Sequence, residues 1–189
     1  VGVQAYRWSC LYGVNVKLNA VDFIARTSLF ATLGLLPLIK GSFLLACLMV
    51  ILLSSSLFIR RRAWWMCSSI LLISVVSMLI FWATVGQPLG GIQSYFSGMV
   101  SIISGYTDAL SLSGRGIEYI IYCIAVMLLI RLLVKVLRGG VYDKLILVLM
   151  FGSILFLAFK AGFVRHDGHA LISAIFILIA ALLVYSITT

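Results

Sequence analysis

The stretch that decides the fold is SFLLACLMVILLSSSLFI at Ser42–Ile59, which has no charged residue and ends at Arg60-Arg61-Arg62. The hydrocarbon core of a bilayer, about 30 Å thick, is crossed by about 20 mostly apolar residues in one helix. The run has nearly this length. It therefore predicts a transmembrane helix that stops where the three arginines begin.

Similar apolar runs lie on both sides of this one, separated by charged residues, glycines and prolines. No repeat, low-complexity tract or soluble domain boundary interrupts them. We therefore expect an all-α fold, a polytopic transmembrane helix bundle in which residues 1–189 form a single transmembrane region. The predicted spans are residues 21–39, 42–59, 63–85, 117–134, 145–159 and 170–187.

The ends of the chain predict a fragment of a larger membrane protein. Val1 is not followed by a signal-peptide pattern with a small-residue cleavage site, and the chain stops directly after an apolar run. Such a fragment would hold only part of any active site. We expect the remainder of the same protein, or partner subunits, to pack against it.

Composition excludes the main soluble classes. Hydrophobic residues make up 63% of the chain, charged residues only 10%, and the mean hydropathy is +1.22, whereas about a quarter of the residues in a soluble domain are charged. The net charge of +9 comes from basic residues placed between apolar runs, not from the basic patch that binds nucleic acid. Membrane lipids are the expected partners. The four cysteines have no CxxC spacing, so we predict neither a metal site nor a cofactor.

The basic residues also predict an orientation, because short cytoplasmic loops carry an excess of Lys and Arg. Alternating the six spans puts ten basic residues on one side and four on the other. The first group is Arg7, Lys17, Arg26, Arg60, Arg61, Arg62, Arg131, Lys135, Arg138 and Lys144, and the second is Lys40, Arg115, Lys160 and Arg165. The first side is therefore predicted to be cytoplasmic, and segments 86–116 and 160–169 to lie outside, in the periplasm if the cell is bacterial.

The outer loop 86–116 has only Asp108 and Arg115 as charges, so it is expected to lie on the membrane. Its apolar residues recur at helical spacing, with polar residues on the other faces, as in an interfacial amphipathic helix. Gly105 is expected to end this helix. The apolar positions are Ile92, Tyr95, Phe96, Met99, Ile103 and Tyr106.

The outer turn 160–169 contains both histidines of the chain, together with Lys160, Arg165 and Asp167. Ionisable groups within the membrane cost free energy and are usually paired, solvated or functional, so a cluster of them between two spans is a candidate site. In a functional interpretation, Arg165 binds phosphate or pyrophosphate through its planar fork and Lys160 adds a second cation. His166 or His169 then transfers a proton near neutral pH.

Two other interpretations of the same turn stay open. Lys160 and Arg165 can extend to lipid head groups while Asp167 pairs with Arg165 and caps the sixth span, with no chemistry involved. Alternatively, His166, Asp167 and His169 are three metal-ligating residue types, but an ordinary site needs further donors that a tight turn does not provide.

Asp108 is the only acidic residue in the outer loop. It is a candidate general base or a ligand for sugar hydroxyls, and Tyr95 or Tyr106 is a candidate to stack on a sugar ring. The alternative is that Asp108 accepts hydrogen bonds from backbone amides in a turn. If the two outer segments form one site, Asp108 should lie within about 10 to 15 Å of the cluster around Arg165.

The two outer motifs, GYTDALS at Gly105–Ser111 and FKAGFVRHDGH at Phe159–His169, resemble those of bacterial envelope glycan polymerases, ligases and GT-C-like glycosyltransferases. These are polytopic inner-membrane enzymes that use polyprenyl-diphosphate-linked sugars at the outer face. The resemblance implies donor-phosphate binding by Arg165 and acid or base catalysis by His169. It also implies more spans than the six that the apolar runs predict.

The leading functional hypothesis is therefore a membrane glycosyltransferase or glycan polymerase acting on a polyprenyl-linked glycan. Its candidate catalytic residues are Asp108, His166 and His169, and its candidate substrate-binding residues are Lys160, Arg165 and Tyr106. Two alternatives from other classes are half of a transporter or channel, and a non-catalytic membrane assembly subunit.

Overall fold

The structure, a computed structural model, describes residues 2–11, 20–137, 140–164 and 168–188. The described residues form eight helices and no strand, which confirms the predicted all-α bundle. The chain divides into two compact units, Val1–Ser104 and Gly105–Thr189. The helices are α1 (Gly2–Leu11), α2 (Ala20–Ile39), α3 (Ser42–Arg60), α4 (Trp64–Thr84), α5 (Gly91–Leu110), α6 (Gly116–Val136), α7 (Val141–Phe163) and α8 (His169–Thr188).

Each of the six predicted spans falls on one long helix, namely α2, α3, α4, α6, α7 and α8. Among the described residues, the first five of these are long and apolar enough to cross a membrane, and the apolar part of α8, His169–Tyr185, is shorter. Large hydrophobic side chains cover their outer surfaces, as is favourable in lipid and costly in water. The chain is an integral membrane protein.

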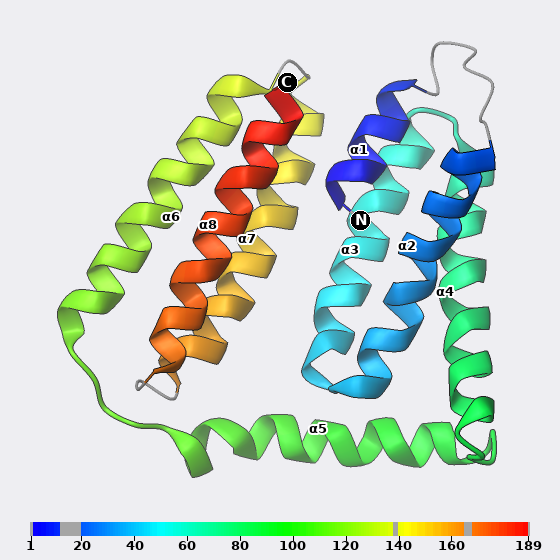
Figure 1. The fold of residues 1–189 in the computed structure, drawn as a ribbon, viewed down its shortest axis with the longest axis horizontal. Helices are drawn as coiled ribbons and strands as arrows, with labels where there is room; N and C mark the ends of the chain where they lie inside the picture. Colours follow the sequence, from blue (N-terminus) through cyan, green and yellow to red (C-terminus); the bar gives the residue numbers. More distant parts are fainter. Residues whose placement is uncertain (1, 12–19, 138–139, 165–167, 189) are drawn as a thin grey trace. The chain divides into compact units, whose positions relative to one another are not determined.

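The first unit contains a helix that was not predicted. α1 lies beside α3 (Figure 1), and its Ala5 and Trp8 are buried in one cluster with residues of α2, α3 and α4. The Trp8 ring meets the Phe30 ring edge to face, with centroids 5.9 Å apart. α1 is therefore a helix packed on the other helices of the first unit, outside the six predicted spans.

α2 and α4 approach closely at Gly34. A Cβ atom at this position would collide with the Ser74 carbonyl oxygen and the Ser77 hydroxyl, and would lie 2.8 Å from the Met78 backbone nitrogen. The Ser77 hydroxyl also donates a hydrogen bond to the Ala31 carbonyl oxygen, at 3.0 Å. Small residues let helices pack closely in lipid, so Gly34 fixes this crossing.

The first part of α5 lies across the end of the α2–α3 hairpin, at a steep angle to the long helices of its unit (Figure 1). Its half-buried face is formed by Ile92, Tyr95, Phe96 and Met99. The Tyr95 hydroxyl bonds the Leu38 carbonyl oxygen, at 2.9 Å. The structure thus confirms a helix with one half-buried face in the segment where the sequence predicts an amphipathic helix.

The end of α5 differs from the prediction. The helix continues through Gly105 to Leu110, so Tyr106 and Asp108 lie in its last turns and not in a loop. A glycine inside a helix costs only about 1 kcal/mol relative to alanine and stops a helix mainly where the backbone turns left-handed. Gly105 has no such backbone conformation.

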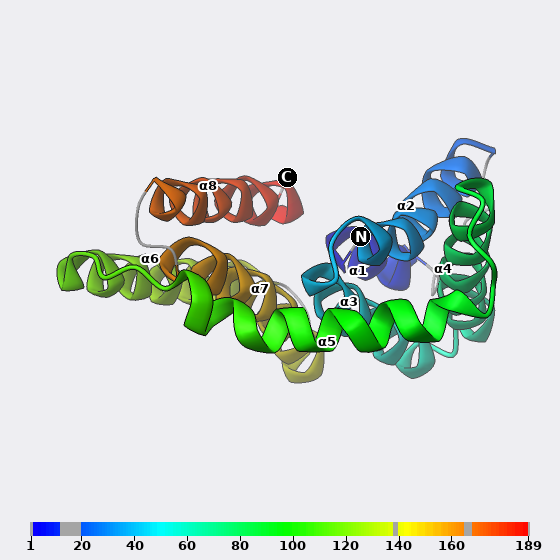
Figure 2. The same ribbon diagram turned by 90° about the horizontal axis from the view of Figure 1, so that it is seen from below.

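The second unit contains the end of α5 and the helices α6, α7 and α8. Both α6 and α8 pack against α7 (Figures 1 and 2). α6 and α7 are joined in the interior by the Tyr122 hydroxyl, which donates to the Leu155 carbonyl oxygen at 2.7 Å. α7 and α8 are joined by the Ser173 hydroxyl, which donates to the Ala158 carbonyl oxygen at 2.9 Å. Most of the candidate site residues belong to this unit.

Candidate functional site

Close packing of α7 on α8 holds Lys160 and His169 at the same end of the second unit. Lys160 lies in the last turn of α7, and His169 is the first residue of α8. Between them, Gly162 packs so tightly that a Cβ atom there would collide with the Ser173 hydroxyl and lie 2.8 Å from the His169 carbonyl oxygen. No larger residue fits at Gly162 without moving the start of α8, so this packing fixes the position of His169.

A backbone hydrogen bond connects the two predicted outer segments. The Leu112 amide, just after α5, donates to the carbonyl oxygen of Val164, just after α7, at 2.9 Å. Asp108 precedes Leu112 by four residues, and Val164 directly precedes Arg165. Because four residues span at most about 14 Å, the backbone of Asp108 lies within this distance of Leu112 and hence near the end of α7.

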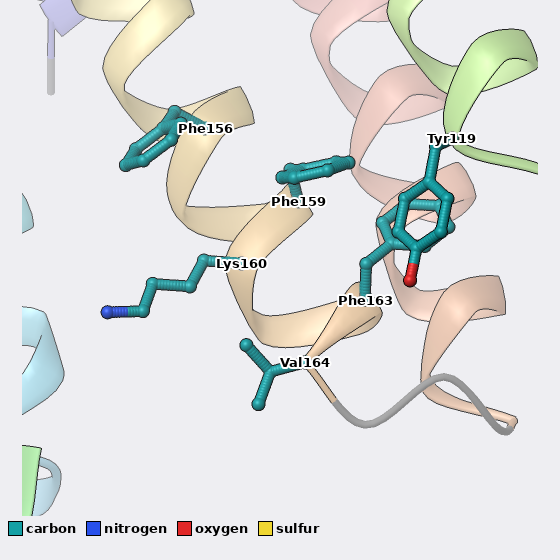
Figure 3. Close-up of a pocket in the computed structure, with 6 residues that line it drawn as sticks. All are labelled: Tyr119, Phe156, Phe159, Lys160, Phe163 and Val164. Atoms are coloured by element: carbon teal, nitrogen blue, oxygen red, sulfur yellow. The ribbon is translucent and has the colours of Figure 1, made fainter. Parts of the chain in front are cut away.

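Aromatic side chains line a pocket of about 180 Å³ at this end of α6 and α7, together with Val164 (Figure 3). The rings of Phe159 and Phe163 have centroids 4.8 Å apart. Tyr119 of α6 meets the Phe163 ring at 4.9 Å. Tilted and edge-to-face contacts of this kind stabilise a cluster beyond its buried area, so the walls of the pocket are preformed.

Lys160 brings a positive charge to the edge of this pocket. Its side chain is exposed and its stem contributes to the lining, while its ammonium group points away from the Tyr119 and Phe163 rings (Figure 3). A lysine near a helix end keeps its stem on apolar surface and its charge among head groups or water. The pocket therefore offers apolar contacts from its aromatic rings, and the Lys160 ammonium group at its edge is a cation that can bind an anion.

The structure describes the candidate site residues only in part. His169 is half-buried at the start of α8, and Lys160 is exposed. Arg165 and His166 lie outside the described residues. For Asp108 and Tyr106 the helical backbone is described and the side chains are not. The proposed roles of these six residues therefore stay predictions.

The metal interpretation of the turn is not tested either. In the part of the chain that the structure describes, no group of three His, Cys, Asp or Glu side chains is placed to hold a metal ion. Two of the three candidate ligands in the turn, His166 and Asp167, fall outside these ranges.

Four aromatic residues of the pocket were not among the candidates from the sequence, namely Tyr119, Phe156, Phe159 and Phe163. A signal for them exists. Phe156, Phe159 and Phe163 follow one another at helical spacing on a single face of α7. Aromatic residues at this spacing usually belong to a packed core, and the facing Tyr119 of α6 cannot be assigned to them without the fold.

No protein-family model, curated protein or solved structure matches this chain. Its function is therefore inferred from the residues and their geometry.

Proposed function

We propose that the chain is part of an integral membrane glycosyltransferase or glycan polymerase that uses a polyprenyl-diphosphate-linked sugar at the outer face of a bacterial inner membrane. The observation that carries this proposal is the hydrogen bond between the Leu112 amide and the Val164 carbonyl oxygen. It brings together the two segments that contain all the candidate acids, bases and cations. A site composed of both segments needs such a connection.

The reaction assigns a role to each residue. A glycosidic bond forms between the acceptor oxygen and the anomeric carbon, while the bond from that carbon to the diphosphate oxygen breaks. Asp108 takes the acceptor proton as general base, and His166 or His169 gives a proton to the departing diphosphate as general acid. Arg165 and Lys160 stabilise the negative charge on the departing lipid diphosphate, and Tyr106 stacks on the sugar.

The long helices argue against the transporter alternative. Transporters of several folds bind their cargo at discontinuous helices near the bilayer midplane. In the described residues, α2, α3, α4, α6, α7 and α8 each run without interruption through the length of a predicted span. Lys160 and His169, the candidate residues whose side chains are described, lie at helix ends and not in the middle of a helix, as suits a reaction at the membrane surface.

A transfer assay tests the proposal. Membranes containing the full chain are supplied with a radiolabelled polyprenyl-diphosphate-linked hexose, and labelled glycan is measured. Arg165→Ala, Arg165→Lys and Asp108→Asn should each reduce transfer, the last by about 10²-fold to 10⁴-fold, as for loss of a general base. Arg165→Lys keeps the charge but loses the planar fork.

Arg115→Lys is the matched control, because Arg115 is an exposed arginine just before α6 that has no role in the proposed reaction. It should transfer as the unsubstituted protein does. Unchanged transfer in Arg165→Lys would reduce Arg165 to a generic positive charge. Unchanged transfer in all three site variants, or no transfer by the whole protein that contains this chain, would refute the proposed enzyme.

A further inference from the structure

The aromatic pocket does not end at Phe159. A second pocket of about 430 Å³ adjoins it along the seam between α6 and α7, and Phe156 and Phe159 belong to both. We call the combined depression the seam groove. The residues used to define it are Tyr119, Tyr122 and Met127 of α6, and Gly152, Phe159 and Lys160 of α7.

The seam groove extends over about one leaflet of a bilayer. At 1.5 Å per residue, Lys160 lies about 5 Å from the end of α7, and Met127 lies about 16 Å from the start of α6 at the same end of the unit. Half of a hydrocarbon core is about 15 Å. The groove is therefore about as long as one leaflet is deep.

The lining of the groove is apolar along its length and has a positive charge near one end, which suits the apolar tail and the phosphate of a lipid. Apart from Lys160, the residues around both pockets are aromatic or aliphatic or are Gly152 and Cys123. Met127 and Phe156 are 62% and 63% exposed, so the groove opens on the surface of its unit. A flexible lysine at one end is a point charge suited to a phosphate group.

We infer that the seam groove binds the single hydrocarbon chain of a polyprenyl phosphate or diphosphate, with the phosphate beside Lys160. One groove between two helices accommodates one chain, whereas a glycerophospholipid carries two. The identity of the lipid rests on the proposed function, but the place and polarity of the groove do not.

Gly152 gives a direct way to close the groove. It lines the deeper pocket, and a Cβ atom added there meets no atom within 4 Å. Gly152→Phe should therefore place a ring in the groove without a collision at its base. Leu178→Phe is the matched control, because Leu178 is 65% exposed on α8, lines neither pocket and lies at a similar distance from the same helix end.

The experiment is photo-crosslinking of the full chain in phosphatidylcholine vesicles with a diazirine-bearing polyprenyl phosphate. Mass spectrometry should locate the label on α6 and α7 between Tyr119 and Met127 and between Gly152 and Lys160. Labelling should fall at least tenfold in Gly152→Phe and stay unchanged in Leu178→Phe. Lys160→Gln should weaken binding about tenfold, as expected for loss of one charge-assisted contact.

Competition identifies the source of the lipid. Unlabelled polyprenyl phosphate should remove the label, and an equal amount of phosphatidylglycerol, which is also anionic, should not. Equal competition by phosphatidylglycerol, label outside the two helices, or full labelling of Gly152→Phe would each overturn the inference. Specific labelling without glycan transfer would contradict the proposed function alone, and transfer by Gly152→Phe at the normal rate would contradict the groove alone.

Discussion

Hydroxyl groups buried in the first unit differ in whether they have a hydrogen-bond partner. The Ser74 hydroxyl donates to the Phe30 carbonyl oxygen at 3.0 Å, and so links α4 to α2. The Ser54 hydroxyl of α3 is also fully buried, but it has no partner among the described residues. A buried polar group stabilises a membrane protein only when it is paired, because hydrocarbon offers no alternative partner.

We therefore expect opposite results from two identical substitutions. Ser74→Ala should lower the free energy of unfolding by about 0.6 kcal/mol, up to about 1.7 kcal/mol, the range of hydrogen bonds between membrane helices. Ser54→Ala should be neutral or stabilising, because it removes an unpaired polar group. Thermal unfolding of both variants in one detergent measures the difference. An equal loss in both would show that side-chain volume, and not hydrogen bonding, determines the effect.

Arg26 shows what residue type alone cannot predict. It was counted with the cytoplasmic charges, but it is only 4% exposed. Its guanidinium donates to the Met66 sulfur at 3.0 Å and lies over the Phe23 ring, 5.6 Å from the centroid. Without Arg26 the distribution of basic residues becomes nine against four, from ten minus one, so the predicted orientation does not depend on it.

At the scale of elements, the sequence predicts the long helices well because their apolar runs match the thickness of a bilayer. It predicts α7 too short, as 145–159, because Tyr142, Asp143 and Lys144 interrupt the apolar run although the helix begins at Val141. Asp143 is only 2% exposed. A helix can bury a polar residue when its fold provides the surroundings, and those surroundings are not visible in a single segment.

The sequence predicts one side of the membrane for both candidate segments, which stays a prediction, but it does not predict their contacts. Loop charges put segments 86–116 and 160–169 on one face. The pairing of Leu112 with Val164 depends on a backbone contact across more than fifty residues, and no local pattern encodes it. The same limit applies to Tyr119, which faces Phe163 only when α6 and α7 pack together.

The docking of α5 provides a prediction at this scale. The Tyr95 hydroxyl donates to the carbonyl oxygens of Leu38, at 2.9 Å, and Pro37, at 3.3 Å, in the last turn of α2. Tyr95→Phe removes both contacts and should cost about 0.5 to 1.5 kcal/mol. Hydrogen exchange should then become faster in the first part of α5 and unchanged in Ser101→Ala, since Ser101 is on the exposed face.

The same contact predicts a pH dependence. Burial raises the pKa of the Tyr95 hydroxyl above its usual value of 10.0. The neutral hydroxyl is the donor, so the stabilisation is complete below that value and is lost as the pH rises through the higher pKa of the folded state. The protection of the α5 amides, relative to their intrinsic base-catalysed exchange rate, should therefore fall above pH 10 in the unsubstituted protein. An equal fall in Tyr95→Phe would assign the effect to another group.

At the scale of the whole molecule, the proposed reaction at the outer face depends on the predicted orientation. If the orientation of the chain in the membrane were the opposite of the predicted one, Lys160 and His169 would face the cytoplasm. A lipid-linked sugar at the outer face could not reach them. The orientation is tested with cysteines placed on exposed positions. Ser97 lies on the exposed face of α5, and Val141, 86% exposed at the start of α7, lies on the predicted cytoplasmic side.

Ser97→Cys and Val141→Cys are made separately in a protein whose own cysteines, Cys10, Cys47, Cys67 and Cys123, are replaced by alanine. In sealed right-side-out vesicles, a membrane-impermeant maleimide should label Ser97→Cys and leave Val141→Cys unlabelled, because the excess of basic residues keeps the Val141 end inside. Detergent should make both reactive, which controls for accessibility. Labelling of Val141→Cys alone in sealed vesicles would show that the orientation is the reverse of the predicted one. It would also refute the proposed reaction at the outer face, since both candidate segments would then lie in the cytoplasm.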